Sequence, residues 1–335
     1  MITPAIGTAE LYEQLEILLD TNTPVFIHGS PGIGKSYIVN NIAKNHNLQI
    51  IDVRLSQLDA IDLRGIPSIK NNQTIWMPPI FLPDDANSHG ILFLDELNSA
   101  PLSVQAAIYQ LVLDRKIGEY TLPKNWKIVC AGNKINDKGI VFKLPSPLIN
   151  RMVHLVLEAR FEDFKTWAVK NNIHPYIVGF LGFRPDLLST EVPSTHETNP
   201  AFCTPRAWTM LSNILTKTSH IENIHPIIQG TVGYAASIEL LSFVNIYKTL
   251  PNIDAILAGV NIVVSQEPST LYALIAALIE RYENIDQAKN LFEFSKGLPI
   301  EFAIILIKDL IVKDQKIVTL DQFEEWLEQY GEYIV

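Results

Sequence analysis

The sequence PVFIHGSPGIGKS, residues 24–36, decides the fold. An apolar run opens it, glycines fill its centre, and a helical pattern follows over residues 36–46. Glycines let a backbone curl until its N–H groups face one centre, and a helix that begins there adds the positive end of its dipole. The pattern therefore predicts a strand, a polyphosphate-binding loop and a helix. The loop residues are Gly29, Ser30, Pro31, Gly32, Ile33, Gly34, Lys35 and Ser36.

Three side chains of this loop have distinct expected roles. Lys35 reaches the β and γ phosphates of a nucleoside triphosphate, and Ser36 coordinates Mg²⁺ through its hydroxyl. Pro31 stiffens the loop because its ring fixes φ. The alternative is a glycine-rich turn without a ligand, which the strand before it and the helix after it disfavour. His28, before the loop, is interpreted as a packed side chain.

The rest of the first half predicts an α/β fold. Short apolar runs of strand length alternate with amphipathic segments, which is typical of a doubly wound parallel sheet. The predicted strands are residues 24–27, 49–55, 90–94, 127–131 and 154–157, and the predicted helices are 8–22, 36–46 and 101–114.

The second half is predicted to be helical, because its apolar residues are spaced three and four apart. A polar, proline-bearing stretch at 189–205 interrupts it. The predicted domains are an αβα nucleotide-binding core at 1–160, a helical lid at 161–250 and a helical C-terminal extension at 251–335. The last segment, 320–333, has one apolar and one acidic face, which predicts a helix that docks on the body or, alternatively, binds a partner.

Two carboxylates follow the predicted strand at 90–94. The carboxyl ends of parallel strands meet at one edge of the sheet, where ligands bind. Asp95 is therefore expected to bind Mg²⁺, and Glu96 to orient the water that attacks the γ-phosphorus. A solvated strand end is the alternative, weakened by the loop 60 residues upstream.

With these motifs the chain resembles the AAA+ ATPases, and within them the MoxR-like branch with its helix-2 insert and pre-sensor hairpin. The run 127–133 resembles the strand that ends in the family's first sensor, here Asn133. Residues 144–151 resemble the segment that carries an arginine finger to the neighbouring subunit, here Arg151. Arg206 resembles the second sensor and lies at a helix start with Thr204 at the N-cap.

The resemblance also implies activity and partners. It implies Mg²⁺-dependent ATP hydrolysis at the interfaces of a ring oligomer, expected to be a hexamer. It also implies remodelling of a protein client, such as one with a von Willebrand factor A-like domain. Each of these three residues also has a simpler interpretation. Asn133 caps the end of its strand, Arg151 forms an ion pair within its own chain, and Arg206 is an exposed arginine on the first turn of a helix. Ser99 and Met152 depart from the branch, which commonly has arginine and phenylalanine there.

Two segments, 66–82 and 116–122, resemble the protrusions of this branch, each expected as a hairpin that faces a central channel. Trp76, Arg115 and Tyr120 are candidate contacts with a client, and local packing is the alternative for each.

Composition limits which other classes of function fit the chain. The net charge is −10, and residues 161–335 carry 12 basic and 21 acidic side chains. This acidity disfavours binding to a phosphate backbone, so a nucleic-acid motor or loader is the second interpretation. A nucleotide-gated scaffold and a small-molecule kinase are further alternatives. The two cysteines suit a reducing compartment and predict a cytoplasmic protein, and the apolar runs are too short to span a membrane. No set of cysteines and histidines has the spacing of a metal site, so Mg²⁺ is expected to arrive with ATP.

Overall fold

A computed structural model describes residues 4–134, 137, 141–193, 200–218 and 220–333. The chain divides into two compact units, Met1–Ala159 and Arg160–Val335, each with its own hydrophobic core. No helix in the described part of the chain has the length and apolarity to cross a membrane.

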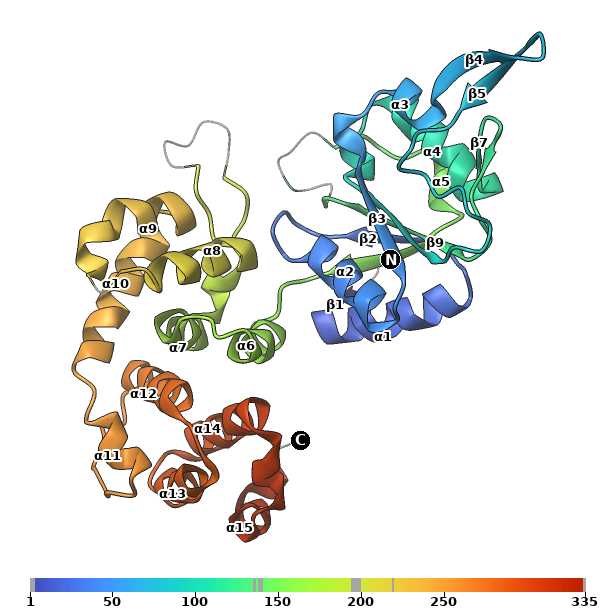
Figure 1. The fold of residues 1–335 in the computed structure, drawn as a ribbon. Helices are drawn as coiled ribbons and strands as arrows, with labels where there is room; N and C mark the ends of the chain where they lie inside the picture. Colours follow the sequence, from blue (N-terminus) through green and yellow to red (C-terminus); the bar gives the residue numbers. More distant parts are fainter. Residues whose placement is uncertain (1–3, 135–136, 138–140, 194–199, 219, 334–335) are drawn as a thin grey trace. The chain divides into compact units, whose positions relative to one another are not determined.

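Unit 1 is built on a parallel sheet (Figure 1). Its described strands pair in the order β1-β10-β2-β9-β6-β3, and every pairing is parallel. The strands are β1 (Ala5–Ile6), β2 (Val25–His28), β3 (Gln49–Arg54), β6 (Gly90–Asp95), β9 (Trp126–Gly132) and β10 (Val153–Leu157). The helices of this unit are α1 (Thr8–Asp20), α2 (Lys35–Asn45), α3 (Ala60–Arg64), α4 (Leu102–Asp114) and α5 (Ser146–Ile149).

Helices cover both faces of this sheet. Neighbouring residues of a strand point to opposite faces, and apolar side chains on each face pack against helices. Val25 and Ile27 belong to a core that also contains residues of α1 and α2. Phe26, between them, belongs to a second core with residues of α4 and α5. This three-layer arrangement confirms the predicted α/β fold and the five predicted strands. Sequence reasoning missed β1, which has two residues.

Two hairpins project from the segments expected to carry them. β4 (Ile66–Lys70) pairs with β5 (Gln73–Met77), and β7 (Lys116–Ile117) pairs with β8 (Tyr120–Thr121). Asn71 and Asn72 form the first turn with φ of 51° and 59°, the left-handed values that a two-residue hairpin turn requires.

The candidate contact residues of these hairpins have partners inside unit 1. Trp76 lies 4.2 Å under the Arg64 guanidinium. Tyr120 donates a hydrogen bond to the Pro83 carbonyl, and Arg115 donates to two further carbonyls. These contacts favour local packing for the three side chains.

Unit 2 consists of helices in its described part. They are α6 (Phe161–Lys170), α7 (Pro175–Phe183), α8 (Pro205–Leu215), α9 (His225–Val232), α10 (Tyr234–Lys248), α11 (Ile253–Leu257), α12 (Pro268–Arg281), α13 (Ile285–Ser295), α14 (Ile300–Lys313) and α15 (Asp321–Tyr330). Part of the polar stretch 189–205, residues 194–199, lies outside the described residues.

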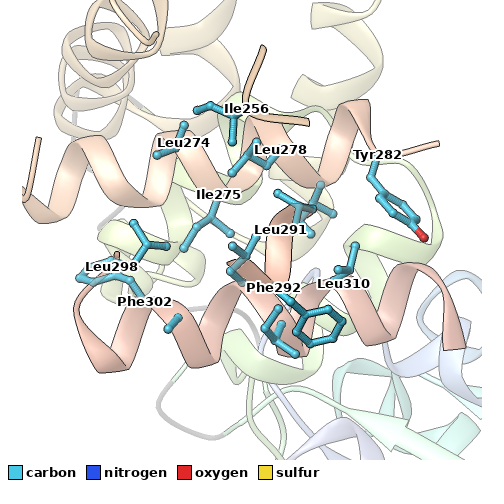
Figure 2. Packing of buried hydrophobic residues seen from close by; sticks show 14 of the residues in the cluster. Ile256, Leu274, Ile275, Leu278, Tyr282, Leu291, Phe292, Leu298, Phe302 and Leu310 are labelled. Atoms are coloured by element: carbon cyan, nitrogen blue, oxygen red, sulfur yellow. The ribbon is translucent and has the colours of Figure 1, made fainter. Parts of the chain in front are cut away.

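One hydrophobic core of unit 2 lies among α11 to α15. Figure 2 shows its side chains, including Leu274 and Leu278 of α12 with Phe292 of α13. Trp326 and Tyr330 bury their rings in the same core, so the amphipathic last helix docks on the unit as predicted.

Helices on either side of residue 250 also pack together in unit 2. A Cβ on Gly179 of α7 would lie 3.1 Å from the Ala276 Cβ of α12, so the two helices approach closely. The division into a lid and an extension near residue 250 stays a prediction.

Candidate nucleotide site

The phosphate-loop motif connects β2 to α2. Gly34 is the N-cap of α2 with φ of 103°, a left-handed value that L side chains rarely adopt. The first N–H groups of α2 therefore face the loop, with the positive end of the helix dipole. Lys35 is buried, and its ammonium group donates to the carbonyls of Gly29 and Ser30. Its charge thus lies within the loop.

Ser36 and Asp95 come together although 59 residues separate them. The Ser36 hydroxyl donates a hydrogen bond to Asp95 Oδ2 at 3.1 Å. Asp95 is the last residue of β6, and β9 alone lies between β6 and β2 in the sheet. A hydroxyl and a carboxylate are hard oxygen donors of the kind that Mg²⁺ prefers. The pair expected to hold the metal ion therefore has suitable chemistry and proximity.

Glu96 occupies an unusual backbone conformation next to this pair. Its φ is 59°, a left-handed value that is uncommon outside glycine, and its N–H donates to Asp95 Oδ1 at 2.8 Å. Such strained residues cluster at functional sites. The Ser56 hydroxyl donates a hydrogen bond to Glu96 Oε2.

Ser56 is a site residue that sequence reasoning missed. It lies in the 3₁₀ turn η1 (Leu55–Gln57), directly after β3. The rule that located Asp95, a polar residue at the carboxyl end of a predicted strand, also applies to Ser56.

Asn133 follows β9 at the same edge of the sheet, between the strands that carry the loop and Asp95. Asn98 fixes its backbone from both sides. Asn98 Nδ2 donates to the Asn133 carbonyl at 2.8 Å, and the Asn133 N–H donates to Asn98 Oδ1 at 3.1 Å. A Cβ on Gly132 would lie 2.2 Å from Asn98 Oδ1, so this contact requires glycine before Asn133.

Asn98 is a second site residue that sequence reasoning missed. It lies in the short turn η2 (Leu97–Ser99) and is 3% exposed. Neither helical nor strand periodicity marks such a position. The only sequence signal is its place two residues after Glu96.

An acidic side chain contacts the loop from the segment after Asn133. The Ser30 hydroxyl donates to Asp137 Oδ1 at 3.0 Å, and the Lys134 N–H donates to Asp137 Oδ2 at 2.9 Å. This contact ties the phosphate loop to the chain that follows β9.

The strand before the loop ends in a histidine pair. His28 Nε2 lies 2.9 Å from His154 Nδ1 on the neighbouring strand β10. Burial, and then the charges of His154 and Lys35, lower the pKa of His28 to about 4. His28 is therefore neutral near pH 7, and its packed position agrees with its sequence interpretation.

Arg151 lies at the other edge of the sheet. It is exposed, comes two residues after the end of α5 and precedes β10, whose first residue Val153 pairs with Val25. The phosphate loop leaves β2 at the opposite end, after His28. The strand between them spans about 10 Å at 3.3 Å per residue. Within the described residues, no carboxylate forms an ion pair with Arg151.

Arg206 belongs to unit 2 and is exposed on the first turn of α8. The predicted cap is present, because the Thr204 hydroxyl accepts a hydrogen bond from the Ala207 N–H at 3.0 Å. A role of Arg206 as a sensor stays a prediction.

Known proteins share the motif-bearing part of this chain. Residues 24–152 match the family model for the AAA domain, dynein-related subfamily. Midasin from Giardia intestinalis is 26% identical over 169 residues, 47% of this chain and 4% of that protein. Midasin from Dictyostelium discoideum is 27% identical over 146 residues, 40% of this chain and 2% of that protein. The chain thus spans a small fraction of these relatives.

A solved structure of RuvB from Thermotoga maritima, described as a Holliday junction branch migration motor, is 17% identical. It covers 81% of this chain and 80% of its own, with a TM-score of 0.37. The matched segment, 24–152, contains the phosphate loop, Asp95, Glu96, Asn133 and Arg151. The similarity to the AAA domain, dynein-related subfamily, thus lies in the segment that carries these residues.

Proposed function

We propose that this chain hydrolyses ATP with Mg²⁺ at sites shared between copies arranged in a ring. Bound Mg²⁺ supplies electrostatic stabilisation to the phosphates. In unit 1, Lys35 neutralises phosphate charge, Ser36 and Asp95 hold the metal ion, and Glu96 orients the attacking water with Asn133 beside it. Arg206 closes unit 2 over the nucleotide as a second sensor.

The position of Arg151 carries the shared-site proposal. Arg151 lies at the opposite edge of the sheet from the phosphate loop of its own chain. An exposed guanidinium there is suited to the nucleotide of a neighbouring copy, where it stabilises the charge on the transferring phosphoryl group. A cyclic oligomer places this edge of each copy against the next copy.

We further propose that the ring is a hexamer of the MoxR-like branch, acts in the cytoplasm and remodels a protein client, as the sequence resemblance implies. The exposed apolar side chains of the β4–β5 hairpin support contact with a protein, since Ile66 is 72% and Ile69 is 82% exposed. In this proposal unit 2 comprises a lid at 161–250 and an extension at 251–335.

One observation favours a second candidate, a nucleotide-gated scaffold with low turnover. Ser56 binds the carboxylate of Glu96, the residue expected to orient the attacking water. A chain that kept this bond with ATP present would assemble on the nucleotide without rapid hydrolysis. Measured turnover separates the two candidates.

The test is steady-state ATPase activity as a function of protein concentration. Activity per chain should rise with concentration, and Lys35→Ala, Glu96→Gln and Arg151→Ala should each abolish most of it, by about 10³-fold or more for Arg151. Lys143→Ala, which removes an exposed cation eight residues before Arg151, should retain activity.

Mixing two inactive variants tests whether sites are shared. In an equal mixture of Lys35→Ala and Arg151→Ala, about a quarter of the interfaces combine an intact loop with an intact arginine, if copies mix randomly. Recovery of activity near that fraction is expected. Full activity of Arg151→Ala alone, or activity per chain independent of concentration, would contradict the proposal.

A further inference from the structure

Unit 2 contains a cleft that is separate from every residue discussed for the nucleotide. Its volume is about 440 Å³, and the ends of α7, α10, α11 and α12 line it. This volume lies in the range of sites that take small ligands or single side chains.

Aromatic rings form one wall of the cleft. The rings of Tyr176 and Tyr247 lie 4.6 Å apart between centroids at 73°, and His174 lies 4.6 Å from Tyr176. Burial lowers the pKa of His174 to about 4, so its ring is uncharged near pH 7. Three neutral rings therefore face the cleft without a positive charge among them, and the electron-rich faces of such rings attract cations.

A carboxylate completes the site. Glu280 lines the cleft and accepts a hydrogen bond from the Tyr247 hydroxyl at 3.1 Å. A hydroxyl donor leaves the negative charge of Glu280 in place. Within the described residues, no lysine or arginine nitrogen forms an ion pair with it.

The two cations at the cleft are engaged elsewhere. Arg281 donates to both carboxylate oxygens of Asp254, at 3.0 and 2.9 Å. Lys248 forms an ion pair with Glu222. Neither Asp254 nor Glu222 lines the cleft. Glu280 is thus the carboxylate of the lining, and it acts electrostatically on the neighbouring Arg281 without an ion-pair contact in the described residues.

We propose that this cleft binds a lysine or arginine side chain of a protein partner. The cationic head lies against the tyrosine rings and Glu280, and the methylene stem packs on Ile253 and Ala277, which also line the cleft. The wider charge of the region is complementary, since residues 161–335 carry 21 acidic and 12 basic side chains. This inference does not depend on ATP hydrolysis.

The experiment titrates capped tripeptides into the full chain and follows binding by ligand-observed NMR. Acetyl-Gly-Lys-Gly-amide and its arginine counterpart should bind in the millimolar range, and the glutamate counterpart should not. Glu280→Gln and Tyr176→Leu should each weaken binding by about fivefold or more. Glu283→Gln, which neutralises an exposed carboxylate outside the cleft, should leave binding unchanged.

Three outcomes with the peptides would overturn the inference. They are equal binding of the glutamate and lysine peptides, unweakened binding to Glu280→Gln, and absence of binding by the lysine and arginine peptides. Putrescine serves as a further probe, because a small polyamine carries the same charged group. Tighter binding of putrescine than of both cationic peptides would refute a protein side chain as the ligand.

Discussion

The Ser56 hydroxyl at the end of β3 donates a hydrogen bond to the carboxylate of Glu96, which follows β6. In the sheet, β3 lies on the far side of β6 from β9 and β2. The bond therefore holds the carboxylate on the side away from Asn133 and the phosphate loop. A Glu96 that orients a water at the phosphate must first leave Ser56.

Replacing Ser56 with alanine should raise basal ATPase activity. The bond that competes with the working position of Glu96 would be lost, and a hydrogen bond contributes about 0.5–1.5 kcal/mol, or roughly two- to tenfold in population. Steady-state turnover at saturating ATP measures this. Ser68→Ala, on the exposed β4 strand, is the matched control. Unchanged or lower turnover of Ser56→Ala would refute the holding role.

Asn98→Asp should lower kcat by about tenfold and leave KM for ATP nearly unchanged, because a buried carboxylate would face the Asn133 carbonyl where the amide now donates. Fluorescent-nucleotide binding and steady-state kinetics measured together check this split. Asn71→Asp, in the exposed hairpin turn, should change neither value. A loss of nucleotide affinity equal to the loss of kcat would contradict a positioning role for Asn98.

His28 should make unfolding depend on pH. Its pKa is about 4 in the folded chain against 6.5 as the ordinary value, so the unfolded chain binds the proton first as pH falls. The free energy of unfolding should therefore decrease from pH 6.5 toward pH 4. Urea unfolding at pH 7 and pH 5 should show a smaller decrease for His28→Gln than for the wild type. Equal decreases would remove His28 as the cause.

Unit 2 contains a buried ion pair between α6 and α14. Lys165 Nζ lies 2.8 Å from Asp309 Oδ1, and both side chains are 10% exposed. Burial raises the pKa of Asp309 to about 6 despite the opposing effect of Lys165.

Lys165→Met should destabilise the chain by about 3–5 kcal/mol near pH 8, because it leaves a buried carboxylate without its partner. The double variant with Asp309→Leu should recover most of this loss. Thermal and urea unfolding measure both. Lys289→Met, which breaks an exposed pair with Asp286, should cost at most about 1 kcal/mol. A double variant no more stable than Lys165→Met would show that charge is not the cause.

The loop and the strand that precedes it could be predicted because their signals are local. Glycine spacing, the apolar run at 24–27 and the helix after it all lie within one short segment. Asp95 and Glu96 were also predictable, since parallel strands end at a common edge and a polar residue directly after an apolar run marks that edge.

Ser56 and Asn98 could not be assigned roles in the same way. Ser56 acts on a residue 40 positions away, and Asn98 acts on one 35 positions away. Both contacts depend on which strands become neighbours, here β3 with β6 and β6 with β9. Sequence periodicity reports burial and element type but not strand order.

The left-handed backbone conformation of Glu96 destabilises the fold, whereas its carboxylate serves the proposed chemistry. Glycine or asparagine would adopt φ of 59° with less strain, whereas glutamate adopts it at a cost of about 1 kcal/mol. A laboratory selection for heat resistance alone would therefore favour replacing Glu96, and the heat-resistant descendants would bind nucleotide without turning it over. If glutamate persisted at position 96 through many generations of mutation, that persistence would be evidence of selection for turnover.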